Sequence, residues 1–168
     1  MVYFTSDHHF GHQNIIKYTD RPFESAKQMD KEMIKVWNNI ISKEDKVFHL
    51  GDFAFAGQER IKEIVSQLNG HIVLIMGNHD RHRTAEWWRK CGFWQVSEFP
   101  IIYKGVYILS HEPVFMNEHM PYANIHGHLH NGKMDDNFHC NVGVELSDYK
   151  PIPMHEIENF FEAKGGVE

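Results

Sequence analysis

The most informative stretch of the sequence is Ile72-Val73-Leu74-Ile75-Met76-Gly77-Asn78-His79-Asp80. Its first six residues form an apolar run, and its last three are polar. A short apolar run that is rich in β-branched residues and closed by glycine is typical of a buried strand. A carboxamide, an imidazole and a carboxylate follow it directly, and together they can bind a metal ion and move protons. Taken alone, the same residues also fit a capped turn into the helix expected around Trp87.

The same arrangement occurs four more times along the chain. The apolar runs at residues 2–6, 47–51, 106–110 and 123–127 lead into Asp7, Asp52, His111 and His128 respectively. His9 and His130 each follow two positions later. In α/β sheets ligands bind beyond the carboxyl ends of the strands. We therefore expect these carboxylates and imidazoles to surround one crevice, where they would form the ligand set of a metal centre.

The segments between the apolar runs predict an α/β fold. Ser25 is expected to cap a helix that continues to Ile41, and further helices are expected at residues 61–68, 84–90 and 154–161. A loop is expected at residues 8–24, a hairpin with its turn at Lys104-Gly105, and a strand over residues 137–146. This order predicts two layers of sheet flanked by helices, in a single domain over residues 1–168.

Composition narrows the function classes. The chain has 14 dispersed histidines, a surplus that metal binding would explain, and a net charge of −6 that argues against broad binding to duplex nucleic acid. Its apolar runs are too short to cross a membrane, and no secretory signal is expected. Cys91 and Cys140 stand outside any metal-binding motif, which favours two reduced thiols and a cytoplasmic location.

Two residue spacings suggest how the ligands converge. Asp7 and His9 stand at i and i+2, as do His128 and His130, and such residues point to one side of an extended chain. His79 is a candidate general acid or base, and Asp80 is expected to hold its imidazole and favour the protonated form. Each motif is weak alone, because D-x-H and H-x-H patterns are also common in surface loops.

Taken together, D-x-H, GD, GNHD, an isolated histidine and GHLH, in this order over residues 5–130, resemble the calcineurin-like metallophosphoesterase superfamily. Residues 141–145 also resemble the tail of its compact bacterial and phage members. The resemblance implies an α/β/β/α sandwich with two divalent metal ions. It also implies ligand roles for two sets of residues, Asp7, His9 and His130 for one ion and Asn78, His111 and His128 for the other. Asp52 matches the bridging carboxylate, and His79 matches the histidine that meets the leaving group.

The resemblance predicts a metal-dependent phosphoesterase. Two ions about 3.5–4 Å apart can bind phosphate oxygens and hold a hydroxide in line with phosphorus. Small phosphodiesters are the favoured substrates, and manganese is the favoured metal, with iron, zinc or nickel as alternatives. Two other functions stay open, a nuclease acting on short oligonucleotides and a catalytically silent binding module with the same fold.

Three further residues are candidates for substrate contact. His12 lies near Asp7 in the sequence, and Arg21 and Arg81 carry charges that suit phosphate oxygens. The competing interpretation is that His12 is a solvated loop residue and that both arginines are ordinary surface charges. No membrane partner is expected, and the sequence does not indicate an oligomeric state.

Overall fold

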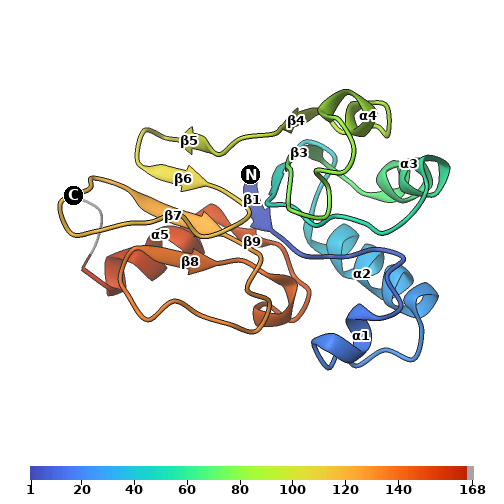
Figure 1. The fold of residues 1–168 in the computed structure, drawn as a ribbon, viewed down its shortest axis with the longest axis horizontal. Helices are drawn as coiled ribbons and strands as arrows, with labels where there is room; N and C mark the ends of the chain where they lie inside the picture. The colour runs from blue at the N-terminus through green and yellow to red at the C-terminus, as the bar shows by residue number, and fades with distance from the viewer. Residues whose placement is uncertain (166–168) are drawn as a thin grey trace.

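The first sheet of the computed structural model has five strands in the order β4-β3-β2-β1-β9 (Figure 1). Its strands are β1 (Val2–Thr5), β2 (Lys46–His49), β3 (His71–Ile75), β4 (Gln95–Ser97) and β9 (Ile152–Pro153). β1 to β4 pair in parallel, and β9 joins β1 antiparallel. The structure describes residues 1–165, so the last three positions of the expected domain lie outside the described part.

The second sheet has four strands in the order β5-β6-β7-β8. Its strands are β5 (Ile101–Tyr103), β6 (Tyr107–Leu109), β7 (Ala123–His126) and β8 (His139–Asn141). β6, β7 and β8 are parallel, whereas β5 and β6 form the expected hairpin. Lys104 and Gly105 take φ values of 52° and 77° at its turn, which is the left-handed geometry that tight hairpins need.

Three helices cover the outer face of the first sheet. They are α2 (Ala26–Ile40), α3 (Gln58–Gln67) and α4 (Ala85–Arg89). Ser25 caps α2 as expected, because its side chain accepts a hydrogen bond from the Gln28 backbone nitrogen at 3.2 Å. Trp37 of α2, Ile64 of α3 and Trp88 of α4 belong to one buried cluster together with side chains from the sheet.

A second buried cluster fills the space between the sheets. Phe4 and Phe48 from the first sheet meet Leu109 and Ile125 from the second. Helix α5 (Met154–Ala163) contacts β9, β1 and β8 and adds Phe161 to the same cluster. The parallel strands are therefore buried on both faces, which explains why they read as continuous apolar runs. Two sheets flanked by helices confirm the expected fold class.

The boundaries differ from expectation in two segments. The expected loop 8–24 contains a short helix, α1 (Ile15–Tyr18), because Ile15 and Ile16 are buried. The expected strand 137–146 is only β8, followed by a 3₁₀ turn at Val144–Leu146. Both cysteines are free and buried, and the described part contains no helix with the length and hydrophobicity of a membrane span.

Candidate metal centre

The predicted ligands lie just beyond the carboxyl ends of five strands. Asp7, Asp52 and Asn78 follow β1, β2 and β3 of the first sheet, whereas His111 and His128 follow β6 and β7 of the second. Parallel neighbours end at the same edge of a sheet. The site therefore forms where the strand ends of the two sheets face each other.

Two groups of these side chains are close enough to hold ions. Asp7, His9 and His130 offer ligand atoms that all lie within 4.8 Å of one another, and so do Asp7, Asp52 and His111. Asp7 belongs to both groups. The Oδ2 atom of Asp52 lies 3.5 Å from His9 Nε2 and 3.4 Å from His111 Nε2, so it stands between the two groups.

Asn78 and His128 extend the second group toward the surface. The Asn78 Oδ1 atom lies 2.9 Å from His111 Nε2 and 3.1 Å from His128 Nδ1. His111 Nδ1 donates to the carbonyl oxygen of Leu50 at 2.7 Å, so Nε2 is the nitrogen that would bind an ion once the ion displaces its proton. Asn78 and His128 are exposed while His111 is buried. This group is therefore open to solvent beside Asn78 and His128 and closed to solvent beside His111.

Orphaned polar atoms show that the site fits metal ions. Among the described residues, Asp7 Oδ1 and His9 Nε2 are buried with no hydrogen-bond partner. Such an unpaired atom costs about 1–3 kcal/mol, and a bound cation would satisfy both. Carboxylate, imidazole and carboxamide donors suit first-row divalent ions. The side chains present therefore fit the two ions that the resemblance implies.

Burial shifts the pKa values of the ligand side chains that are shielded from solvent. It raises the pKa of Asp7 to about 6 and lowers the pKa of His9 to about 2, so His9 is the neutral imidazole that metals bind. Burial would also raise the pKa of Asp52. The hydrogen bond and charge of His111 nevertheless hold the pKa of Asp52 below its ordinary value. Asp52 thus stays ionised at the centre of the site.

The backbone at the ligands is left-handed, which corrects one expectation. Positive φ values occur at Asp7 (60°), His9 (52°), Asp52 (54°), His128 (68°) and His130 (48°). Residues other than glycine rarely adopt this region, and it costs of order 1–3 kcal/mol each. The idea that the i and i+2 pairs converge along extended chain is wrong. The left-handed turns aim these side chains instead.

Two glycines allow the turns to approach one another. A Cβ atom at Gly77 would lie 2.6 Å from the Asp52 backbone nitrogen, and one at Gly127 would lie 2.5 Å from Asp7 Oδ2. Neither glycine has a positive φ, so the requirement is space rather than conformation. The close approach of these turns therefore depends on the absence of a side chain at both positions.

His79 stands at the open side of the ligands. Its side chain is 45% exposed, and its Nε2 atom lies 3.9 Å from Asp52 Oδ2. Its backbone nitrogen donates to Asp52 Oδ1 at 3.0 Å, which ties the loop to the central carboxylate. The ring packs against Phe55, with centroids 4.9 Å apart. Phe55 is itself exposed, so an aromatic wall stands beside His79 that the sequence did not indicate.

The role expected for Asp80 is wrong. Its carboxylate is buried and accepts backbone N–H groups from Asp52 at 2.7 Å, Gly77 at 2.8 Å and Phe53 at 3.2 Å. Among the described residues no hydrogen bond joins it to the His79 ring. Asp80 is a positioning residue that holds two ligand loops together, because its oxygens are occupied by main-chain donors.

The three residues expected to touch substrate differ in placement. Arg21 is buried and donates to the carbonyl oxygens of Asp7 and His8, both at 2.7 Å, so the expectation that it binds substrate is wrong. Arg81 pairs with Glu112 through two bonds of 2.6 and 2.7 Å at the surface. For Arg81, substrate contact stays a prediction.

His12 remains beside the site. Its ring stacks on Phe55 with centroids 4.2 Å apart and lies 5.5 Å from the His9 ring. Burial lowers its pKa, and the charge of His79 acts in the same direction. His12 therefore belongs to the rim, and its contact with substrate stays a prediction.

Glu145 is the buried acidic partner of the site that the motifs did not assign. It accepts hydrogen bonds from Arg21 and from His130 Nδ1, the latter at 3.0 Å. Burial would raise its pKa, but His130 and Arg21 lower the pKa of Glu145 to about 2. Its position in the tail segment 141–145 was the only signal in the sequence.

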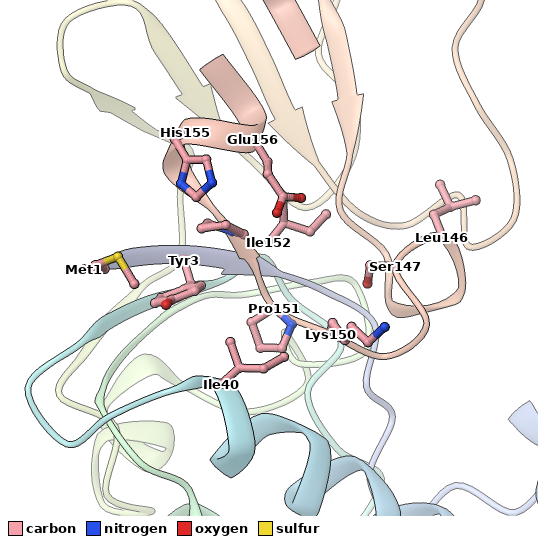
Figure 2. A pocket seen from close by; sticks show the side chains of 11 residues that line it. Met1, Tyr3, Ile40, Leu146, Ser147, Lys150, Pro151, Ile152, His155 and Glu156 are labelled. Atoms are coloured by element: carbon pink, nitrogen blue, oxygen red, sulfur yellow. The ribbon is translucent and has the colours of Figure 1, made fainter. Parts of the chain in front are cut away.

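A separate pocket of about 370 Å³ lies between the end of α2 and the start of α5 (Figure 2). Ile40, Tyr3 and Pro151 form one side, while His155 and Glu156 stand on the other. None of the seven predicted ligands is among the described residues that line it. This pocket is therefore distinct from the metal centre.

Comparisons with known proteins agree with this site. The family model for calcineurin-like phosphoesterases matches residues 1–165. Uncharacterized protein MJ1445 of Methanocaldococcus jannaschii is 35% identical over 178 residues, which cover 99% of this chain and 93% of that one. The gene 66 protein of Mycobacterium phage L5 is 32% identical over 82 residues, which cover 47% of this chain and 39% of the phage protein.

A solved structure extends the likeness to three dimensions. AQ665, a protein of unknown function from Aquifex aeolicus, matches with a TM-score of 0.72 and 28% identity, over 95% of this chain and 98% of that chain. With its motifs, its two sheets and the family match over nearly its whole length, the chain belongs to the calcineurin-like phosphoesterases. Membership supports a metal-dependent hydrolase of phosphoric esters in general.

Proposed function

We propose that this protein is a two-metal phosphoesterase that hydrolyses small phosphodiesters. One observation carries the proposal, namely that Asp52 Oδ2 stands 3.5 Å from His9 Nε2 and 3.4 Å from His111 Nε2. A carboxylate that is shared by two ions must be ionised and must lie between the two groups of ligands. This position supports the assignment of Asp52 as the bridging carboxylate.

Charge balance supports an anionic substrate. Two divalent ions would bring four positive charges, and Asp7 and Asp52 would offset two of them. When bound, such ions orient phosphate oxygens and activate a water for attack on phosphorus. Asn78 adds an oxygen ligand without adding negative charge, so the surplus remains available to a phosphate. We favour manganese, with iron, zinc and nickel as alternatives for this donor set.

We assign to His79 the role of donating a proton to the leaving oxygen. Its Nε2 atom lies 3.9 Å from Asp52 Oδ2, and its side chain is 45% exposed. A substrate phosphate over the ligands would therefore have its leaving group within reach of this ring. Donation of the Nε2 proton, or the positive charge of the imidazolium, would stabilise the departing alkoxide.

The size of the site favours small diesters. We expect the loops 8–24 and 112–123 and the exposed Phe55 side chain to frame the substrate, and the net charge of −6 disfavours a duplex. Short oligonucleotides remain the alternative substrate. The silent binding module is disfavoured because all seven ligand residues are present, and because Asp7 Oδ1 and His9 Nε2 have no hydrogen-bond partner in the described part. The buried free cysteines support the proposed cytoplasmic location.

A substrate panel tests this function. Purified full-length protein with manganese is assayed on bis-nitrophenyl phosphate, nitrophenyl phosphate, a short oligonucleotide and a phosphopeptide. We expect the diester to be cleaved, and we expect Asp52→Asn and added chelator each to abolish turnover. Rapid phosphopeptide hydrolysis with an inert diester would contradict the diester preference. Preferred cleavage of the oligonucleotide would favour the nuclease alternative.

A further inference from the structure

A single oxygen of Glu145 collects three hydrogen bonds from distant parts of the chain. Its Oε1 atom accepts from Arg21 Nη2 at 2.6 Å, from Arg21 Nε at 3.1 Å and from His130 Nδ1 at 3.0 Å. Arg21 and Glu145 are 124 positions apart. This oxygen therefore links the loop after β1, the loop after β7 and the turn after β8.

The ion pair is almost completely buried. The Arg21 side chain is 0% exposed and that of Glu145 is 3% exposed. The guanidinium also donates to the carbonyl oxygens of Asp7 and His8, so it is fixed to the backbone of a ligand segment. A buried ion pair is weak support for stability, since the cost of removing its charges from water offsets the attraction. Its position suggests a role at the site instead.

The bond between Glu145 and His130 determines which nitrogen of the ring carries the proton. A carboxylate that is paired with a guanidinium can only accept, so the His130 Nδ1 atom must donate. The lone pair is then on Nε2, the nitrogen left available to an ion. His111 achieves the same result with the Leu50 carbonyl oxygen. Of the two ligand groups in the described part, only the one formed by Asp7, His9 and His130 has a charged partner that is not itself a ligand.

We infer that Glu145, held by Arg21, is the positioning residue that sets the affinity of the ion site formed by Asp7, His9 and His130. The inference rests on the proposed two-metal function. The negative charge makes the His130 ring a stronger donor and fixes its orientation. Loss of such a partner typically weakens metal affinity about 10–100-fold. The site containing Asn78 has no contact with Glu145 among the described residues, so its affinity should change little.

The test measures metal binding directly. Chelator-treated full-length wild type and Glu145→Gln are titrated with Mn²⁺ by calorimetry, and crystals at intermediate Mn²⁺ are compared by anomalous scattering. Gln keeps an oxygen for Arg21 but removes the charge. The matched control is Asp136→Asn, because Asp136 holds His139 Nδ1 at 2.8 Å in the same way but away from the ligands.

We expect Glu145→Gln to weaken one of two binding steps about 10–100-fold. The anomalous peak beside Asp7 and His9 should fade first, and Asp136→Asn should bind both ions as wild type does. Equal binding by Glu145→Gln and wild type would overturn the inference while leaving the proposed function intact. Failure of wild type itself to bind two ions would reject both.

The ring tautomer gives a second measurement that needs no variant. Histidine ¹H–¹⁵N spectra of the zinc-loaded wild type should show His130 protonated at Nδ1 with nitrogen Nε2 unprotonated. Circular dichroism checks that Glu145→Gln is folded before its titration is interpreted. Should that variant fail to fold, a proton on Nε2 of His130 in the wild type would still refute the inference, and one on Nδ1 would support it.

Discussion

The Oδ2 atom of Asp80 lies 2.7 Å from the backbone nitrogen of Asp52. The same oxygen accepts the Gly77 N–H at 2.8 Å, so one buried carboxylate fastens the turn after β2 to the turn after β3. Burial raises the pKa of Asp80 to about 7. The relative position of Asp52 and Asn78 therefore depends on a residue that need not touch metal or substrate.

Asp80→Asn should loosen this connection. A carboxamide has one acceptor oxygen, and its NH₂ group would face a main-chain N–H that also donates. We expect the free energy of unfolding to fall by about 1–3 kcal/mol, measured by urea denaturation. The loss of kcat should be the same for esters with good and poor leaving groups. A loss confined to poor leaving groups would instead restore the role of orienting His79.

Gly127→Ala should destabilise the site at the turn after β7. Its Cβ atom would lie 2.5 Å from Asp7 Oδ2, which must shift to make room. We expect a cost of about 1–3 kcal/mol in unfolding free energy together with reduced metal content. Gly57→Ala is the control for metal content, because its Cβ would meet nothing within 4 Å and its φ is −73°. Gly57 is the N-cap of α3, so the control loses some stability but should keep its metal. An equal loss of metal in both variants would argue against the steric explanation.

His79→Asn separates metal binding from proton transfer. The ring is exposed and its removal leaves the seven ligands in place, so metal content should match wild type. We expect kcat to fall about 10²–10⁴-fold for alkyl esters and much less for nitrophenyl esters, whose leaving group barely needs a proton. Kinetics across a series of leaving groups measure this. Equal losses along the series, with full metal content, would exclude the proton-donor role.

Ser25→Ala tests the start of α2. The Ser25 side chain accepts from the Gln28 nitrogen at 3.2 Å, and losing such a cap costs about 0.5–2 kcal/mol. Ser66→Ala is the control in α3, where the hydroxyl bonds back to the Glu63 carbonyl oxygen and alanine is the better helix former. We expect opposite signs in thermal denaturation. A neutral Ser25→Ala would show that packing alone sets this boundary.

The strand ends and their ligands could be predicted because the signal is local. Each apolar run shows where a buried strand ends, and parallel pairing then brings Asp7, Asp52 and Asn78 to one edge without further information. The role of Ser25 as a helix cap could be predicted for the same reason, since a cap acts within a few residues. These features need only short stretches of sequence and a general rule of sheet geometry.

The direction in which the ligand side chains point could not be predicted. The left-handed turns at Asp7 and His9 are held by bonds from their nitrogens to Gly51 and Asp52 carbonyl oxygens, both 3.0 Å, in a neighbouring loop. Residue spacing carries no information about such tertiary contacts. The extended-chain argument therefore gave correct neighbours for Asp7 and His9 by an incorrect geometry.

The buried charges were hidden for the same reason. Arg21 suggested a phosphate contact because an arginine in a polar loop is usually exposed, and its partner Glu145 lies 124 positions away. Asp80 suggested a partner for His79 because the two are adjacent in sequence, but backbone donors from another loop occupy its oxygens. Long-range pairing decided both roles.

The most direct test of the account is the number of metal ions per chain. Wild type prepared without chelator and saturated with manganese is measured by elemental analysis, with anomalous scattering to locate the ions. The account predicts two adjacent ions that share Asp52, and a loss of metal in Asp52→Ala. At most one ion under saturating manganese, or wild-type turnover by Asp52→Ala, would contradict it.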